Sequence, residues 1–123
     1  MTGKRRILVV EDNLMLAETY VDLLGHWGYD VLEVQATGEA AIEAARRESP
    51  DLVLMDISLD GRMDGIEASG LIAADLGVPI IIISGLGDEV RRARAARIKK
   101  HRFMVKPIDF KRLENTLKEL LTQ

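Results

Sequence analysis

The sequence predicts an α/β fold, a doubly wound domain in which a five-stranded parallel sheet carries helices on both faces. Short runs that are apolar at consecutive positions indicate strands buried on both sides. Between these runs lie segments whose apolar residues recur at helical spacing. A strand followed by a helix, repeated five times, favours a parallel sheet with right-handed crossovers.

Four of the five expected strands are short apolar runs, and the other is less apolar. The runs cover residues 7–10, 52–55, 80–83 and, more weakly, 103–105. The remaining strand, at 29–34, has apolar residues at Val31, Leu32 and Val34, so we expect it at a partly exposed edge of the sheet.

Glycine or proline is expected to end each of the first three helices. These helices cover about 14–24, 38–48 and 65–76, and the residues at their ends are Gly25 and Gly28, Pro50, and Gly77 and Pro79. The first helix is expected to present one apolar stripe, formed by Leu14, Ala17, Tyr20, Val21 and Leu24.

The last two helices differ in how well their sequences fit a core. In the fourth, about 88–98, the candidates for core contacts are Val90, Ala93, and Ala96 or Ile98, so its packing should be the loosest. The fifth begins after Pro107 with Asp109 as its N-cap. Its inward-facing residues are expected to be Phe110, Leu113, Leu117, Leu120 and Leu121.

Length and composition fit one globular domain that spans residues 1–123, with no output domain. The net charge of -3 does not indicate a nucleic-acid binder. The absence of cysteine removes disulfides and thiolate nucleophiles and is compatible with the cytoplasm, where we expect the protein. The apolar run at 7–10 is too short for a signal peptide or a membrane span.

Polar residues follow four of the apolar strands at the point where each strand ends. They are Glu11 and Asp12, Asp56, Ser84, and Lys106. The carboxyl ends of parallel strands meet at one edge of the sheet, where such folds bind ligands. Three crowded carboxylates need a cation, and oxygen ligands favour Mg²⁺. A lysine and a hydroxyl beside them complete the equipment for phosphoryl transfer.

These residues resemble the receiver domain of bacterial two-component response regulators, and the likeness covers essentially the whole chain. The matching positions are Glu11-Asp12, Asp56, Met63-Asp64-Gly65, Ser84 and Lys106-Pro107. The resemblance implies a flavodoxin-like fold with strand order 2-1-3-4-5. It also implies a stand-alone signalling switch of the chemotaxis-regulator type.

The resemblance also assigns roles near the phosphoacceptor. Asp56 would take a phosphoryl group from a phosphohistidine on a sensor histidine kinase or a histidine phosphotransfer protein. The cation, Mg²⁺ or Mn²⁺, would be bound directly by Asp12 and Asp56 and mainly through water by Glu11. The backbone carbonyl of Ser58 would complete the protein ligands.

The resemblance also assigns roles to residues in or directly after the last two expected strands. Lys106 would hold a phosphoryl oxygen, and the Lys106-Pro107 bond would be cis. Ser84 would move toward the phosphoryl group, and Phe103 would change rotamer in step. Phe103 is equally compatible with plain packing. Asp12 alone could instead cap the first helix.

Residues 91–102 form the most unusual local composition of the chain. Their cations are Arg91, Arg92, Arg94, Arg97, Lys99, Lys100 and Arg102. One interpretation is a solvated helix face, and the favoured one is a docking patch for a downstream protein partner of acidic character. Nucleic acid is disfavoured because no aromatic residues interleave with the basic ones, and no membrane partner is expected.

The leading hypothesis is therefore a phosphoacceptor switch that changes its affinity for a partner or relays the phosphate. It would be no enzyme beyond its own phosphorylation and autodephosphorylation. The alternative is a small Mg²⁺-dependent phosphatase with an aspartyl nucleophile, but Ser58 stands where such enzymes need a second aspartate. A nucleotide binder lacks its glycine-rich motif here, and a degenerate receiver would not keep all five site positions.

Overall fold

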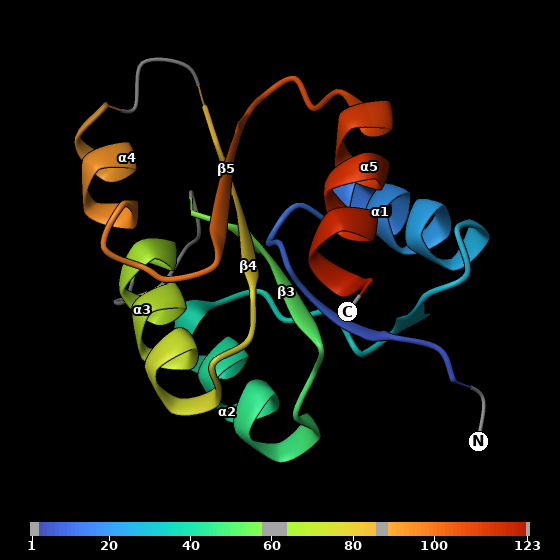
Figure 1. The fold of residues 1–123 in the computed structure, drawn as a ribbon, viewed down its shortest axis with the longest axis horizontal. Helices are drawn as coiled ribbons and strands as arrows, with labels where there is room; N and C mark the ends of the chain where they lie inside the picture. Colours follow the sequence, from blue (N-terminus) through green and yellow to red (C-terminus); the bar gives the residue numbers. More distant parts are fainter. Residues whose placement is uncertain (1–2, 58–63, 86–88, 123) are drawn as a thin grey trace.

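A computed structural model of the chain describes residues 3–57, 64–85 and 89–122. In these ranges a parallel sheet of five strands is flanked by five helices (Figure 1). The strands are β1 (Arg6–Val10), β2 (Asp30–Val31), β3 (Leu52–Asp56), β4 (Ile80–Ser84) and β5 (His101–Val105). The helices are α1 (Leu14–His26), α2 (Gly38–Glu48), α3 (Gly65–Leu76), α4 (Glu89–Ala95) and α5 (Phe110–Leu121).

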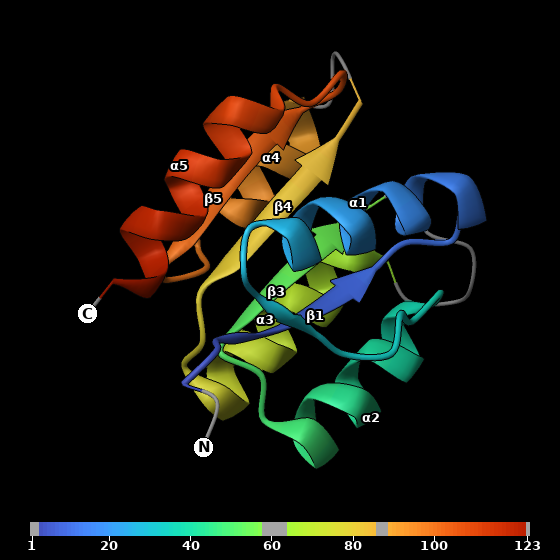
Figure 2. The same ribbon diagram turned by 90° about the vertical axis from the view of Figure 1, so that its right-hand side faces the viewer.

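The sheet has the strand order β2-β1-β3-β4-β5, so the predicted fold class and order are confirmed. All neighbouring strands pair in parallel. Figure 2 shows the arrowheads of β1, β3 and β4 pointing toward the same edge. The residues that directly follow these strands therefore lie along that edge.

The sheet separates two hydrophobic cores. Because successive side chains of a strand point to opposite faces, Ile80 and Ile82 pack in one core, and Ile81 and Ile83 pack in the other. The first core includes residues of α2, α3 and α4, and the second includes residues of α1 and α5. Figure 1 shows these two groups of helices on opposite sides of the sheet.

Side-chain caps explain where four of the helices begin. Asn13, Thr37, Asp64 and Asp109 each precede a helix with extended backbone, and each side chain accepts a backbone N–H of the first turn. The predicted cap at Asp109 is confirmed, as are the predicted ranges of α2 and α3. The interpretation of Asp12 as the cap of α1 is wrong, because Asn13 has that position.

Several predicted core contacts are wrong. Leu14 and Phe110 are exposed because each lies at the first residue of its helix, beyond the body of the core. Helix α4 is shorter than predicted, and Val90 and Ala93 face solvent. Of the predicted candidates Ile98 is buried in the core and Ala96 is exposed, and Ala95 makes a core contact that was not predicted. The edge strand is also shorter than the predicted 29–34.

No helix within the described ranges is long and apolar enough to cross a membrane.

Candidate functional site

Asp56 and Lys106 form a close ion pair at the carboxyl edge of the sheet. Asp56 is the last residue of β3, and its side chain is 2% exposed. The Lys106 Nζ donates a hydrogen bond to Asp56 Oδ2 over 2.8 Å. Lys106 directly follows β5, and its bond to Pro107 is cis as predicted. A buried carboxylate thus has one oxygen bound to a cation that reaches in from a strand two places away.

Glu11 lies beside this pair and is itself almost fully buried. Its Oε2 accepts the backbone N–H of Asn13 at 3.1 Å, whereas its Oε1 is buried and has no hydrogen-bond partner among the described residues. Burial and a hydrogen-bonding contact with Asp56 raise the pKa of Glu11 to about 8. The two acids therefore share a site in which they do not both ionise easily near neutral pH.

The acids around Lys106 change its pKa. Burial alone would lower the pKa of Lys106, but the hydrogen bond and attraction from Asp56 outweigh burial, and Glu11 and Asp12 add to this attraction. The net shift of the Lys106 pKa is upward. Asp12 is less buried than Glu11 and contributes here through its charge. The lysine is thus held in its charged form as the counterion of the acidic cluster.

Ser84 lies on β4, the neighbour of β3, and Phe103 lies on β5, one strand further along the sheet. Ser84 ends β4 and is fully buried, and its carbonyl accepts the backbone N–H of Lys106 at 2.7 Å. Phe103 is half-buried on the face covered by α4, where the Arg92 guanidinium lies 5.3 Å from its ring centroid. The carbonyl contact places Ser84 beside Lys106. The switch roles of Ser84 and Phe103 stay predictions.

The structure thus brings three predicted site residues into contact, namely Glu11, Asp56 and Lys106. Asp12 lies within electrostatic reach of Lys106. The predicted carbonyl ligand Ser58 and the motif residue Met63 fall outside the described residues.

Gly65 is the first residue of α3 and the last residue of the motif Met63-Asp64-Gly65. A Cβ on Gly65 would lie 2.6 Å from the Ile57 Cα and 2.9 Å from the Asp56 carbonyl oxygen. Real Cβ atoms essentially never come so close to such atoms. Glycine at this position therefore lets α3 begin directly against the end of β3.

Tyr20 was predicted only as a core residue. It is buried in α1, and its hydroxyl has no hydrogen-bond partner among the described residues. Burial, followed by the charges of Glu11 and Asp56, raises the pKa of Tyr20. A helical stripe can predict that a tyrosine is buried, but it cannot predict what its hydroxyl faces.

Asp64 joins the start of α3 to α4. Its carboxylate caps α3 at the Glu67 N–H and also accepts Arg94 Nη1 at 2.9 Å. Partial burial would raise the pKa of Asp64, but the bonds from Arg94 and Glu67 outweigh it and lower this pKa. The Asp64–Arg94 pair thus links the start of α3 to α4. The spacing of the two residues in the sequence does not indicate this contact.

A small divalent cation fits the acidic cluster. Within the described ranges no group of three or more acidic or histidine side chains is placed to hold a metal ion. Glu11 nevertheless has a buried oxygen with no hydrogen-bond partner in the described part of the chain, and its pKa is raised by burial and by Asp56. Mg²⁺ commonly takes one or two carboxylates and keeps several waters, and this oxygen-only donor set suits it.

The arrangement can support chemistry at an oxygen of Asp56. A carboxylate with one oxygen bound to lysine has a second oxygen able to attack an electrophile such as phosphorus. A charged lysine amine can also stabilise negative charge on a transferred group. Nearby acids provide the ligand types for a cation that would neutralise that group.

Comparisons with known proteins agree with this geometry. The family model of the response regulator receiver domain matches residues 7–118. The transcriptional regulatory protein PdtaR of Mycobacterium tuberculosis is 34% identical over 84% of the chain and 50% of its own length. The DNA-binding response regulator MtrA of Mycobacterium bovis is 36% identical over 91% of the chain and 48% of its own length. The chain thus spans about half the length of these curated relatives.

Solved structures show the same relationship. The signal receiver domain of a modulated diguanylate cyclase from Desulfovibrio desulfuricans G20 superposes with a TM-score of 0.89 at 33% identity, covering 98% of this chain and 95% of that one. The receiver domain of sensor histidine kinase PA1611 from Pseudomonas aeruginosa PAO1, which has a magnesium ion coordinated in its active-site cleft, gives 0.85 at 28% identity, with 98% and 100% coverage. An acid–lysine pair at the edge of a 2-1-3-4-5 sheet and a family match over most of the chain together show that this protein belongs to the response regulator receiver domains.

Proposed function

We propose that the protein is a phosphoacceptor signalling switch. It takes a phosphoryl group from a phosphohistidine onto Asp56 in a Mg²⁺-dependent reaction, and it then changes its affinity for a partner or relays the phosphate. The donor would be a sensor histidine kinase or a histidine phosphotransfer protein. The absence of cysteine is compatible with the cytoplasm as the place where this occurs.

One observation carries the proposal: a nearly buried Asp56 carboxylate is paired with Lys106 and lies against Glu11. An isolated ionised carboxylate is costly to bury, so a protein that keeps one at a strand end must compensate its charge. Lys106 contributes to this compensation, and a second acid, Glu11, lies in contact with Asp56. The site is thus suited to receive further positive charge together with a phosphoryl group.

Each residue of the site then has a defined task. Asp56 supplies the attacking oxygen, and Lys106 exchanges part of its contact with Asp56 for a phosphoryl oxygen. Asp12, Asp56 and the carbonyl of residue 58 would bind the cation, with Glu11 acting mainly through water. When bound, Mg²⁺ neutralises charge on the acids and on the incoming phosphoryl oxygens. The Ser84 hydroxyl donates to a phosphoryl oxygen after transfer.

The transfer step is a displacement at phosphorus. An Asp56 carboxylate oxygen forms a bond to phosphorus while the P–N bond of the phosphohistidine breaks. The electron pair of that bond stays on the imidazole nitrogen of the donor, which is protonated from solvent. The product is an acyl phosphate on Asp56. Water later attacks the phosphorus and restores the carboxylate with release of inorganic phosphate.

Incubation with acetyl phosphate and Mg²⁺, followed by intact mass measurement, tests the proposal. We expect the mass to increase by one phosphoryl group, and this increase to be lost in Asp56→Asn and when EDTA replaces Mg²⁺. Asp109→Asn is a matched control, because Asp109 is an exposed helix cap on the described surface, and it should still be phosphorylated.

Two results would contradict the proposal. The first is a wild-type protein whose mass does not change under conditions that phosphorylate a known receiver. The second is multiple turnover of a phosphate monoester such as p-nitrophenyl phosphate that depends on Asp56. That second result would instead support the phosphatase interpretation.

A further inference from the structure

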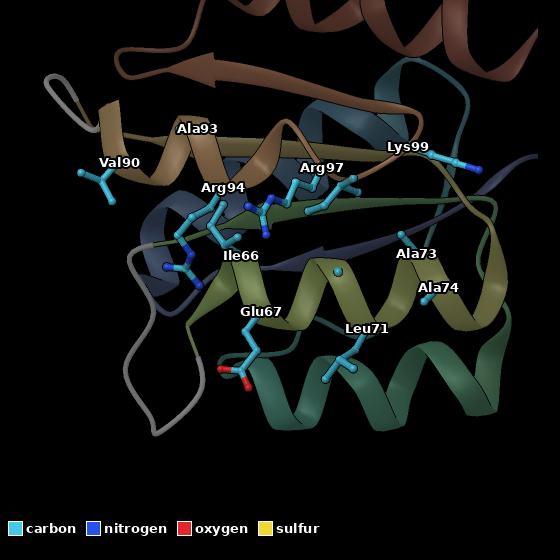
Figure 3. A pocket seen from close by; sticks show the side chains of 12 residues that line it. Ile66, Glu67, Leu71, Ala73, Ala74, Val90, Ala93, Arg94, Arg97 and Lys99 are labelled. Carbon is cyan, nitrogen blue, oxygen red and sulfur yellow. The ribbon is translucent and has the colours of Figure 1, made fainter.

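A groove runs between α3 and α4. It has a volume of about 1090 Å³. Part of its lining consists of residues with a small side chain or none, namely Gly70, Ala73 and Ala93. The apolar Ile66 and Ile98 also line it. Figure 3 shows Arg94 and Arg97 reaching from the α4 side toward α3, with Val90 at one end of the groove and Lys99 at the other. The groove is wide enough to admit side chains of another molecule.

Two large exposed apolar side chains lie at this groove. Leu71 on α3 is 42% exposed, and Val90 on α4 is 74% exposed. Both line the groove, and they are two of the five large exposed hydrophobic residues in the described part of the chain. Exposed apolar surface that gathers beside a concave region indicates a binding site more strongly than isolated exposed residues do.

The charges at the groove are mostly positive. Among the described residues its lining includes Arg94, Arg97 and Lys99 but only one acid, Glu67. Arg94 is paired with Asp64. Arg97 and Lys99 are exposed and make no ion pair with another described residue. The groove thus combines an apolar floor with two cations that no acid of the described ranges pairs with.

We propose that the α3–α4 groove binds an acidic amphipathic segment of the output partner. Apolar side chains of that segment insert between the helices and contact Leu71 and Val90, and its carboxylates pair with Arg97 and Lys99. This is helix-in-groove recognition with charge complementarity at the rim. The inference deepens the proposed function, because it names the chemistry of the partner on which that function depends.

Both walls of the groove are connected to the phosphoacceptor strand. Helix α3 begins at Gly65, directly against the carbonyl of Asp56. Asp64, the cap of the same helix, holds α4 through Arg94. A shift at the end of β3 would therefore change the spacing of α3 and α4. The groove is placed to have different affinity before and after phosphorylation.

Two other occupants fit less well. A second copy of the chain would bring the same basic rim against itself in a twofold contact, which like charges disfavour. A nucleic acid would meet an apolar floor, and none of the lining residues in the described ranges is an aromatic on which bases could stack. The surface chemistry therefore favours an acidic protein segment.

Fluorescence anisotropy with labelled peptides tests the inference on the full chain. The probe is a helical peptide of about 15 residues with leucines at i, i+3, i+4 and i+7 spacing and glutamates beside them. One control peptide replaces the leucines by serine, and another replaces the glutamates by lysine. We expect the acidic leucine peptide to bind at least about tenfold more tightly than either control, since each lacks one of the two contact types.

Two protein variants locate the binding. A Cβ at Gly70 would meet nothing within 4 Å, so Gly70→Leu places a side chain into the groove from a helix that tolerates it. We expect Gly70→Leu to abolish binding without lowering the melting temperature. Arg97→Glu should weaken binding about tenfold or more. Lys111→Glu on α5 makes the same charge change outside the groove and should leave binding unchanged.

Several results would overturn the inference: equal binding of all three peptides, binding that survives Gly70→Leu, self-association abolished by Gly70→Leu, or displacement of the peptide by an RNA oligonucleotide. Measurements before and after acetyl phosphate treatment separate this inference from the proposed function. Phosphorylation without peptide binding in either state would refute only the groove proposal. Peptide binding without phosphorylation would refute only the phosphoacceptor proposal.

Discussion

Replacement of Gly65 by alanine tests how tightly α3 is packed against the phosphoacceptor strand. The added methyl carbon would lie 2.6 Å from the Ile57 Cα and 2.9 Å from the Asp56 carbonyl oxygen, whereas ordinary contacts begin at 3.4 Å. Both atoms belong to the backbone, so no side-chain rotation can relieve the overlap. Either α3 or the end of β3 must move by the better part of an ångström.

The expected cost is that of overpacking. Forcing extra methyl groups into well-packed regions typically costs about 1–3 kcal/mol. For a chain of this length each kcal/mol lowers the melting temperature by roughly 3–5 °C. Because the displaced atoms include the backbone of Asp56, we also expect slower phosphorylation by acetyl phosphate than in the wild type.

Gly70→Ala is the matched control within the same helix. A Cβ at Gly70 meets nothing within 4 Å, so the substitution brings only the better helix propensity of alanine, about 0.5–1 kcal/mol. Urea unfolding followed by circular dichroism should therefore show midpoints that move in opposite directions. A Gly65→Ala protein as stable as Gly70→Ala would refute the close approach of α3 to β3.

Three further predictions concern the acidic cluster. In EDTA, stability should fall as the pH rises from 5 to 8, by at most about 1.4 kcal/mol per pH unit, because the folded-state pKa of Glu11 is about 8 against an ordinary value of 4.5. The protonated form of Glu11 stabilises the fold fully below pH 4.5, and this stabilisation is lost as the pH rises through 8. Mg²⁺ should therefore restore stability more at pH 8 than at pH 5, as measured by urea midpoints. Lys106→Gln removes the cation that binds Asp56 Oδ2, so the rate of phosphorylation by acetyl phosphate, followed by intact mass, should fall about 100-fold. Tyr20→Phe removes a buried hydroxyl that has no hydrogen-bond partner among the described residues, so the free energy of unfolding should stay equal or rise by up to about 1 kcal/mol.

Each of these predictions has its own control. Glu11→Gln should flatten the pH dependence in EDTA, and an unchanged slope would show that another group causes it. Lys118→Gln, which alters a lysine of α5, should not change the phosphorylation rate. A Tyr20→Phe protein that loses more than about 1 kcal/mol would show that the hydroxyl has a partner.

Most of the fold could be predicted because its strands have an unambiguous pattern. The run at 80–83 is apolar at every position, and only a strand covered on both faces satisfies such a pattern in so few residues. Caps such as Asp109 and stops such as Gly77 gave helix ends in the same way. Leu14 and Phe110 were misplaced because helical periodicity alone does not show where a core ends.

The register of helix α4 was harder to predict because most of its residues are arginine or alanine. Alanine fits both a core and an exposed face, so the register of this helix depended on tertiary contacts. The structure buries Ala95 and exposes Ala93, the reverse of the periodic assignment. The groove beside α4 follows from that register, and no pattern in the sequence indicates it.

The acids and lysine of the site could be predicted because topology alone carries strand ends to one edge. The raised pKa of Glu11, the steric role of Gly65 and the Asp64–Arg94 pair could not, since each depends on distances between side chains or backbones. Residue type shows which chemistry is available. Geometry shows how strongly neighbouring groups alter it.

The division of the interior into two cores has a consequence for how such a protein can diversify. The sheet separates the core residues that contact α1 and α5 from those that contact α2, α3 and α4. A substitution in one core and a substitution in the other should therefore change the free energy of unfolding nearly additively. One core can thus accumulate substitutions that suit a new phosphoryl donor while the other accumulates substitutions that suit a new output partner. The strand ends between them belong to both layers and leave the least freedom for change.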